Sequence, residues 1–317
     1  MLKKEIEKVL RKQHYAIFGN SAVQICRWTK KSLRNEGFCY KQKFYGISSH
    51  KCCQMSPCVF FCQNKCLHCW RAIEFILRNK LKIKDEPKEI IENSIKAQRK
   101  LLSGFKGFKG TNMEKWKEAQ NPNNFAISLI GEPTLYPKLA ELILLLRKQK
   151  ITSFLVTNGL CPEKLIELER KNALPTQLYL SLNAPNKKLY EKMHKSKLKN
   201  AWKIFNKSLN LLRKLPTRKV IRMTLVRELN MIEPENYAKL IKKSDVDFIE
   251  VKGFISVGYA RKRLGYERMP SHSEIKNFSR KLLKFLPKYK FLDEQEVSKV
   301  VLLGKDKRRM KIKESEI

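Results

Sequence analysis

The sequence predicts an α/β fold built on a parallel sheet, and three observations support this. Short apolar segments alternate with helical segments six times along the chain, the pattern of parallel strands joined by right-handed crossovers. Of the 317 residues, 42% are hydrophobic, which is enough to bury a full core and excludes a largely disordered chain. Polar and turn-forming residues follow the strands and should gather at one rim. An open wound sheet and a barrel or partial barrel both fit, and in each case ligands bind beyond the carboxyl ends of the strands.

The elements are expected in a regular order, with an irregular, cysteine-rich stretch at residues 20–70. Residues 1–14 predict a charged helix, and Gly19-Asn20 predicts a turn. The apolar runs expected to be strands are Pro57–Phe61, Asn124–Ile130, Ser153–Val156, Gln177–Leu182, Lys219–Val226 and Asp247–Ile255. The segments expected to be helical are Pro87–Leu102, Pro137–Lys148, Pro162–Lys171, Asn186–Leu215, Pro234–Lys243 and Ser271–Phe285. A short strand-rich tail follows the last helix.

The charge balance points to a polyanionic partner. Lys and Arg number 68 against 30 Asp and Glu, which gives a formal net charge of +38. Such an imbalance costs self-repulsion that nucleic acid would remove. Lysine enrichment for heat adaptation is the alternative, but it normally raises Glu as well. Segments that combine aromatic and basic residues are the candidates for base stacking and phosphate contact: Arg27–Lys31, Phe105–Lys109 and Tyr259–Arg263.

Nothing in the sequence predicts a membrane span or an export signal. The longest apolar runs, such as Leu142–Leu146, are far too short to cross a bilayer. The N-terminal helix is charged and lacks the apolar core of a signal peptide. We therefore expect a soluble, cytoplasmic protein.

The cysteines give the most specific chemical signal. There are nine, an odd number in a chain without an export signal, which argues against a disulfide framework. Cys62, Cys66 and Cys69 follow a C-x3-C-x2-C spacing, so three thiolates can hold one iron–sulfur cubane and leave its fourth iron open. A structural zinc site would prefer paired C-x2-C arms and a fourth ligand.

A second set of cysteines lies upstream at equal spacing. Cys26, Cys39 and Cys52 are each separated by twelve residues and suggest a second three-ligand cluster. Cys53 competes with Cys52 for this place, and Cys58 has no assigned role. Cys161 stands alone, and a small buried thiol is its simplest interpretation.

These motifs resemble the radical S-adenosylmethionine superfamily. The cysteine loop follows the first strand, and Gly131-Glu132-Pro133-Thr134 follows the second, with Ile130 in place of the first glycine of the superfamily's GGEP motif. The resemblance implies a partial (β/α)6 TIM-like barrel over residues 55–260, an N-terminal extension at 1–54 with the second cysteine set, and a C-terminal helix and tail at 261–317. It also implies a 4Fe–4S cluster on the C-x3-C-x2-C cysteines. His68 stands where members of the superfamily often have an aromatic residue, and its ring could stack on the adenine of S-adenosylmethionine. The strand-end residues expected to bind S-adenosylmethionine are Gly131, Glu132, Pro133, Thr134, Asn158 and Asn183.

Over nearly its full length, the chain resembles the archaeal, single-domain tRNA 4-demethylwyosine synthases. This family is a lyase family that converts N1-methylguanosine at position 37 of phenylalanine tRNA, with pyruvate, to 4-demethylwyosine. The resemblance implies two 4Fe–4S clusters, a base flipped out of the anticodon loop, a monomer and a separate one-electron reductant, since no flavin-binding segment is visible. Pyruvate would be chelated by the open iron of the second cluster or form an imine with a lysine, for which Lys41 and Lys252 are the candidates.

Two other functions remain open from the sequence. One is a different radical S-adenosylmethionine enzyme, although no further ligand set is visible. The other is a non-catalytic iron–sulfur or zinc module that binds nucleic acid. The Gly131–Thr134 motif and the long series of strands argue against such a module.

Overall fold

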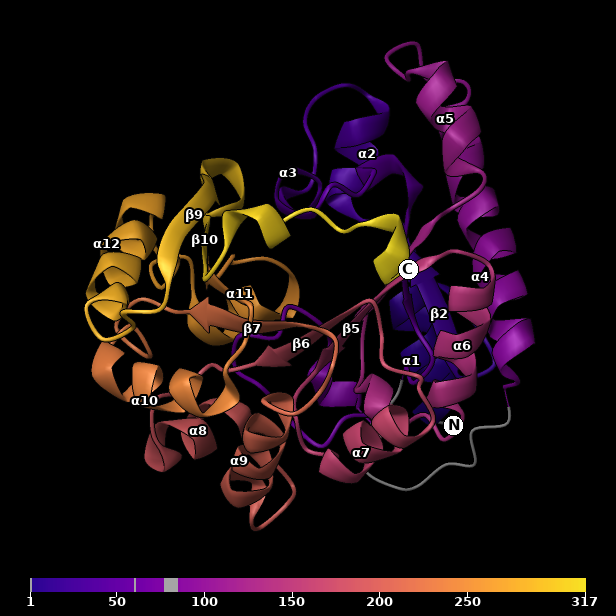
Figure 1. Cartoon of the computed structure of the whole chain (residues 1–317). Coiled ribbons are helices and arrows are strands. Elements are labelled where there is room, and N and C mark those ends of the chain that lie inside the picture. The colour runs from indigo at the N-terminus through magenta and orange to yellow at the C-terminus, as the bar shows by residue number, and fades with distance from the viewer. Residues whose placement is uncertain (1, 60, 77–84) are drawn as a thin grey trace.

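The described part of the chain folds around an open sheet of ten strands. The computed structural model describes residues 2–59, 61–76 and 85–317. Six strands at the centre run parallel and in chain order: β3 (Cys52–Ser56), β4 (Asn124–Ile127), β5 (Thr152–Thr157), β6 (Gln177–Ser181), β7 (Arg218–Leu225) and β8 (Phe248–Gly253). The sheet does not close on itself. The predicted α/β fold is therefore confirmed as a partial rather than a closed barrel (Figure 1).

Antiparallel strands extend the parallel centre at both edges. On the β3 side lie β2 (Ser21–Gln24) and β1 (Ala16–Phe18), and on the β8 side lie β10 (Val300–Gly304) and β9 (Lys290–Gln295). Segments before residue 55 and after residue 260 thus join the same sheet as the parallel centre.

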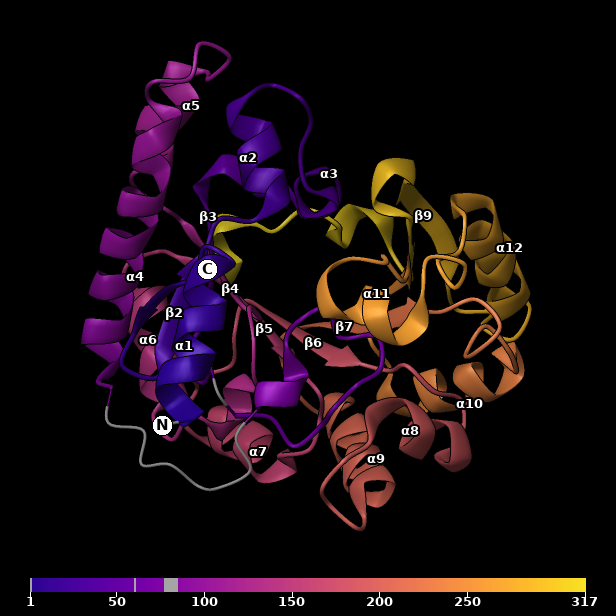
Figure 2. The ribbon, with the colours of Figure 1, turned by 180° about the vertical axis from the view of Figure 1, so that it is seen from behind.

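Helices between the strands cover one side of the sheet. In chain order they are α4 (Pro87–Leu102), α6 (Leu139–Lys148), α7 (Pro162–Arg170), α8 (Lys187–His194), α9 (Ala201–Leu212) and α10 (Pro234–Ser244), followed by α12 (His272–Leu283). Three of them, α4, α7 and α10, begin with proline, whose fixed φ suits the first helical position and whose missing N–H costs nothing there. The remaining helices are α1 (Leu2–Lys12), α2 (Arg27–Leu33), α3 (Tyr40–Tyr45), α5 (Met113–Ala119) and α11 (Gly258–Leu264). Figures 1 and 2 show α2 and α3 across the sheet from α7, α8 and α9.

The two faces of the sheet bury different cores because side chains alternate along each strand. On β7, Ile221 and Met223 pack into the large core beneath the helices. Val220 faces the concave side, where a second cluster includes Phe44 and Tyr45 from α3. A fully buried aromatic side chain stabilises the fold by about 2–3 kcal/mol, so α3 covers a concave face that an open sheet would otherwise expose.

Two predictions about the N-terminal third are wrong. The expected strand Pro57–Phe61 is not formed: β3 lies at Cys52–Ser56, and Phe60 falls outside the described residues. Pro57 lacks the N–H that a central strand needs. The stretch from 20 to 70 is also not irregular, because it contains β2, α2, α3 and β3. These elements are only four to seven residues long, too short for a periodic pattern to reveal.

The lengths of the helices also bear on the membrane question. Within residues 2–59, 61–76 and 85–317, none of them combines the length and apolar composition needed to cross a bilayer.

Candidate active site

The cysteine loop that follows β3 is held against the turn that follows β4. Gly131 adopts φ +77°, and a Cβ there would lie 1.8 Å from the carbonyl oxygen of Cys58. The backbone N–H of Glu132 donates to the carbonyl of Phe61 at 2.7 Å. Only glycine allows this close approach of two backbones, so the two predicted motifs are placed together by main-chain contacts.

Glu132 is a buried carboxylate that only neutral donors satisfy. It is 2% exposed and accepts hydrogen bonds from the hydroxyls of Thr134 and Thr157, both at 2.7 Å. The backbone N–H groups of Thr134 and Asn158 donate at 3.1 and 2.8 Å. Burial raises the pKa of this carboxyl, and no Lys, Arg or His of the described chain pairs with it. A buried carboxylate without a cationic partner fits an incoming ammonium group, such as the amino group of S-adenosylmethionine.

The three cysteines of this loop, Cys62, Cys66 and Cys69, are called the loop triad. Asn158 lies against it, with its amide nitrogen 3.7 Å from the sulfur of Cys62 and 3.1 Å from the side-chain oxygen of Gln63. Burial raises the pKa of the Cys62 thiol to about 12, and the charge of Cys69 adds to this. The thiols thus lie within electrostatic range of one another, although no three His, Cys, Asp or Glu side chains of the described residues meet as closely as a bound metal requires. Buried thiols of raised pKa become thiolates only beside a cation, and a metal supplies one.

An arginine far along the chain fixes the loop triad from the other side. Arg263 on α11 donates to the backbone carbonyls of Leu67, at 3.1 Å, and of Cys69, and it pairs with Glu74. Tyr259 at the start of α11 donates its backbone N–H to the carbonyl of Trp70 at 3.0 Å. Arg263 was expected to contact tRNA phosphates, but the structure commits its guanidinium to the loop. Because 194 residues separate it from Cys69, no local sequence signal reveals this role.

Two neutral histidines line the same end of the sheet. The amide nitrogen of Asn183 lies 3.3 Å from Nε2 of His68 and 3.4 Å from Nε2 of His194. Burial lowers the pKa of His68 to about 3 and that of His194 to about 4. The side-chain oxygen of Asn183 accepts the backbone N–H of Thr224 at 2.8 Å. Asn183 therefore links the end of β6 to the loop triad, as Asn158 does for β5.

The second predicted set, Cys26, Cys39 and Cys52, is called the extension triad. Cys26 and Cys39 immediately precede α2 and α3, and Cys52 opens β3. Burial raises the pKa of both Cys39 and Cys52 to about 12, and both are within electrostatic range of Cys26. Cys53 is fully buried in the helix-side core. Strand alternation thus puts Cys52, and not Cys53, beside the other two cysteines.

Lys41 is a buried lysine at the extension triad. It is 8% exposed, and its Nζ lies 4.4 Å from the ring centroids of both Phe154 and Tyr179. Burial lowers the pKa of its amine, while the nearby Glu250 raises it. Apart from these ring contacts, its Nζ has no hydrogen bond or ion pair with any described residue. Lowering the pKa of a buried lysine increases the fraction of its amine that is neutral, and only the neutral amine can act as a nucleophile.

Lys252 reaches the concave face from β8 but is differently held. Its Nζ donates to the backbone carbonyl of Ser298 at 2.5 Å and lies 5.4 Å from the ring centroid of Tyr40. Burial lowers its pKa to about 8. The two lysine candidates therefore share the concave face, and only Lys252 donates a hydrogen bond.

Sequence reasoning missed two charged residues on this face. Glu250 is fully buried and accepts the hydroxyl groups of Tyr40 and Tyr45, each at 2.8 Å. Arg222 lies opposite Glu250 in the register of β7 and β8. The available signal was a charged residue at alternate positions of an apolar strand, as in Ile221-Arg222-Met223.

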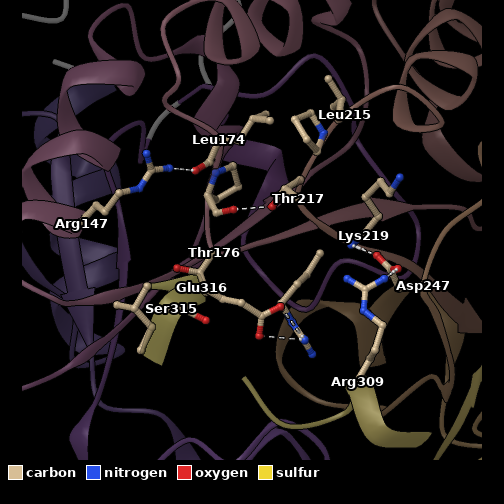
Figure 3. A pocket seen from close by; sticks show the side chains of 14 residues that line it. Arg147, Leu174, Thr176, Leu215, Thr217, Lys219, Asp247, Arg309, Ser315 and Glu316 are labelled. Atoms are coloured by element: carbon tan, nitrogen blue, oxygen red, sulfur yellow. Dashed lines mark hydrogen bonds and ion pairs between the residues drawn. The ribbon is translucent and has the colours of Figure 1, made fainter. Parts of the chain in front are cut away.

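A cavity lies at the other end of the strands. It has a volume of about 580 Å³ and is lined by residues around the starts of β6, β7 and β8, by Arg147 of α6 and by residues of the C-terminal segment after β10 (Figure 3). Its arginines are already paired within the protein: Arg218 with Glu316 at 3.2 Å, and Arg309 with Asp247 at 2.6 Å. It contains none of the predicted site residues, and we assign it no part in the active site.

Comparison with family models covers most of the chain. The Radical SAM superfamily matches residues 56–241, and a family described as Wyosine base formation matches residues 243–305. Radical SAM proteins use S-adenosylmethionine and a 4Fe–4S cluster, which the loop triad and Glu132 fit.

Curated relatives match nearly the whole chain. An S-adenosyl-L-methionine-dependent tRNA 4-demethylwyosine synthase of Pyrococcus horikoshii is 48% identical, with 96% of this chain and 89% of that protein covered. The protein of the same name from Methanocaldococcus jannaschii is 38% identical, with 98% and 99% covered. The human relative is 36% identical over 96% of this chain, which spans only 41% of that protein.

Solved structures agree with this relationship. A structure described as TYW1 with a lysine–pyruvate adduct bound has a TM-score of 0.86 at 37% identity and covers 98% of both chains. A crystal structure of archaeal TYW1 has a TM-score of 0.78 at 34% identity and covers 95% of both. This chain belongs to the family of S-adenosyl-L-methionine-dependent tRNA 4-demethylwyosine synthases, within the radical SAM superfamily.

Proposed function

We propose that this protein converts N1-methylguanosine at position 37 of phenylalanine tRNA to 4-demethylwyosine, with pyruvate as the carbon donor. The observation that carries the proposal is the contact of the loop triad with Glu132 at the carboxyl end of the strands, together with a buried lysine on the concave face, in a chain that matches this family over 96% of its length. When bound, the cluster and S-adenosylmethionine supply a 5′-deoxyadenosyl radical. The proposal includes a monomer in the cytoplasm and a separate one-electron donor.

The residues of this chain bind and orient the cofactor. The loop triad would hold the cluster, and the carboxylate of Glu132 would receive the ammonium group of S-adenosylmethionine. Asn158 and Asn183 keep the strand ends in place through their hydrogen bonds to Leu160 and Thr224. Arg263 keeps the loop from opening. These contacts fix the geometry before the substrate arrives, which is what positioning of a reactive species requires.

Lys41 is proposed to bind pyruvate covalently. Its neutral amine attacks the ketone carbon, a proton passes from nitrogen to oxygen, and water leaves as a C=N bond joins lysine and pyruvate. Burial over two aromatic rings favours the neutral amine. The lysine–pyruvate adduct named for the related TYW1 structure supports this assignment. Lys252 is the alternative nucleophile, but its hydrogen bond to Ser298 would first have to break.

The extension triad is proposed to hold the second 4Fe–4S cluster beside this lysine. Cys39 and Cys52 both lie within electrostatic range of Lys41. The cluster would supply an open iron, which acts as a Lewis acid toward a carbonyl group. The two routes left open by the sequence, chelation and imine formation, thus concern the same group of residues.

The tRNA is proposed to approach over α2 and the segment after α4. The candidate segment Phe105–Lys109 meets α2, because the guanidinium of Arg34 lies 4.6 Å from the ring centroid of Phe108 and 5.5 Å from that of Phe105. Phe108 is 50% exposed, and Arg27 and Lys31 flank the ring of Trp28. Cations interleaved with exposed rings suit a single-stranded loop. Figures 1 and 2 both show α2 beside α5, the helix that follows this segment.

Anaerobic incubation tests the function directly. The protein is mixed with tRNA that contains methylguanosine, pyruvate, S-adenosylmethionine and a reductant, and the nucleosides are analysed by mass spectrometry. We expect the tricyclic base and about eight irons per chain. Zinc in place of iron, with no product, would instead support a nucleic-acid-binding module.

Borohydride trapping tests the lysine. Treatment with pyruvate and borohydride should add one reduced pyruvate to the wild-type chain and to Lys252→Ala, and nothing to Lys41→Ala. An adduct that persists in Lys41→Ala and disappears in Lys252→Ala would transfer the role to Lys252.

A further inference from the structure

Arg222 lies on the concave face, and the strand register determines how far it is from the carboxyl ends of the strands. It faces this side because it alternates with Ile221 and Met223, which pack into the helix-side core. Its partners on the neighbouring strands are Ser181 and Glu250. Arg222 pairs with Ser181, which is two residues nearer the carboxyl end of β6 than Tyr179. The Nζ of Lys41 lies over the ring of Tyr179. Arg222 is thus between Lys41 and the end of the sheet that carries the loop triad.

Among the described residues, the guanidinium of Arg222 has no hydrogen-bond or ion-pair partner. Glu250, the anion opposite it, already accepts two tyrosine hydroxyl groups, one on each oxygen. In the part of the chain that the structure describes, Arg222 makes no ion pair and no side-chain hydrogen bond. Arg222 is partly exposed. Its side chain lies within electrostatic range of Tyr40, Glu250 and Tyr179 on the concave face. An arginine placed among such groups is normally paired, so one without a partner among the described residues offers a binding position for an anion.

The charges around Arg222 favour an anionic ligand. Three cations, Lys41, Arg222 and Lys252, share the face with one carboxylate, Glu250. Lys252 is held by Ser298, and Lys41 lies over aromatic rings. Arg222 is the cation left with a free planar fork, which matches a carboxylate in a bidentate manner.

We propose that Arg222 is the residue that binds the carboxylate of the α-keto acid, and so sets its ketone carbon in front of Lys41. The inference rests on the proposed function, because it takes pyruvate and Lys41 from there. It adds a specificity determinant: neutral ketones and aldehydes, which lack the carboxylate, are discriminated against at Arg222 and not at the lysine.

Equilibrium dialysis with radiolabelled pyruvate tests the subsite without the imine. In a Lys41→Ala background, Arg222→Gln should raise the dissociation constant of pyruvate by about 10–100-fold, the usual cost of a charge-assisted hydrogen-bonded pair. Arg222→Lys, which keeps the charge and loses the fork, should fall between. Arg170→Gln is the matched control, since Arg170 is exposed at the end of α7, and it should leave the constant unchanged.

A second measurement separates carboxylate binding from damage to the fold. With Lys41 intact, the concentration that gives half-maximal borohydride trapping is measured for pyruvate and for its neutral amide, pyruvamide. Arg222→Gln should raise the value for pyruvate and leave that for pyruvamide unchanged, so the preference for the acid disappears. Equal losses for both compounds, or an unchanged dissociation constant in dialysis, would overturn the proposal. Absence of any trapped adduct in the wild type would instead remove the imine from the proposed function, while dialysis still decides the role of Arg222.

Discussion

Gly131→Ala should separate the turn after β4 from the cysteine loop. The new Cβ would lie 1.8 Å from the carbonyl oxygen of Cys58 and 2.8 Å from that of Phe61, both backbone atoms that no side-chain rotation can move aside. An alanine at φ +77° adds about 1 kcal/mol of strain. Displaced backbone costs about 1–3 kcal/mol more, and the lost hydrogen bond from Glu132 to Phe61 about 1 kcal/mol. We expect the free energy of unfolding to fall by about 3–5 kcal/mol.

Thermal unfolding and iron content measure this effect. A loss of that size should lower the unfolding midpoint by roughly 5–8 °C in a chain of this length. Iron bound by the loop triad should fall with it, because the loop loses its support. The matched control is Gly107→Ala, where a Cβ would meet no atom within 4 Å. If Gly131→Ala unfolds within about 1 kcal/mol of Gly107→Ala and keeps its iron, this account of the loop is refuted.

Three further predictions concern the clusters, the buried histidine and the tRNA surface. Alanine at any loop-triad position should abolish reductive cleavage of S-adenosylmethionine. A triple alanine variant of the extension triad should still cleave S-adenosylmethionine but form no tricyclic base. Formation of the tricyclic base by that triple variant would contradict the proposed second cluster. Burial holds the pKa of His194 at about 4 in the folded chain. In the unfolded chain this histidine binds a proton below about pH 6.5, whereas in the folded chain it stays neutral down to about pH 4. The contribution of the neutral histidine to the free energy of unfolding is therefore present above pH 6.5 and is lost as the pH falls toward 4. The free energy of unfolding is measured by urea titration at pH 7.5, 6.5 and 5.5. His194→Leu should lose less stability per pH unit than the wild type, by at most about 1.4 kcal/mol per pH unit. The same pH dependence in both proteins would contradict this role of His194. Affinity for tRNA should fall about 10³-fold or more between 50 and 200 mM salt if roughly six phosphates are neutralised. Arg34→Gln should reduce the slope of log affinity against log salt concentration by about 1 if Arg34 contacts one phosphate. A wild-type slope shallower than about −1 would rule out the phosphate-contacting surface.

The sequence by itself determined the fold class, because alternation is a local property. Strands such as Gln177–Ser181 and helices such as Pro87–Leu102 are long enough to show their period, and the structure places them within a residue or so of the expected bounds. It also determined the cysteine motifs and the Gly131–Thr134 turn, since their ligands or contacts lie within a few residues of one another. The short elements before residue 57 escaped it, because a helix of six residues such as α3 has too few turns to show a pattern.

Only the tertiary structure decided which distant residues share the active site. Position on the concave face, and not spacing, places the amine of Lys41 over aromatic rings and ties that of Lys252 to Ser298. Strand alternation separates Cys52 from Cys53, and register brings Arg222 opposite Glu250. Arg263 reaches the cysteine loop across 194 residues of sequence. Contacts of this kind depend on how distant segments pack against the sheet. The local sequence carries no signal for them, because a lysine, arginine or cysteine at these positions is equally compatible with an exposed site.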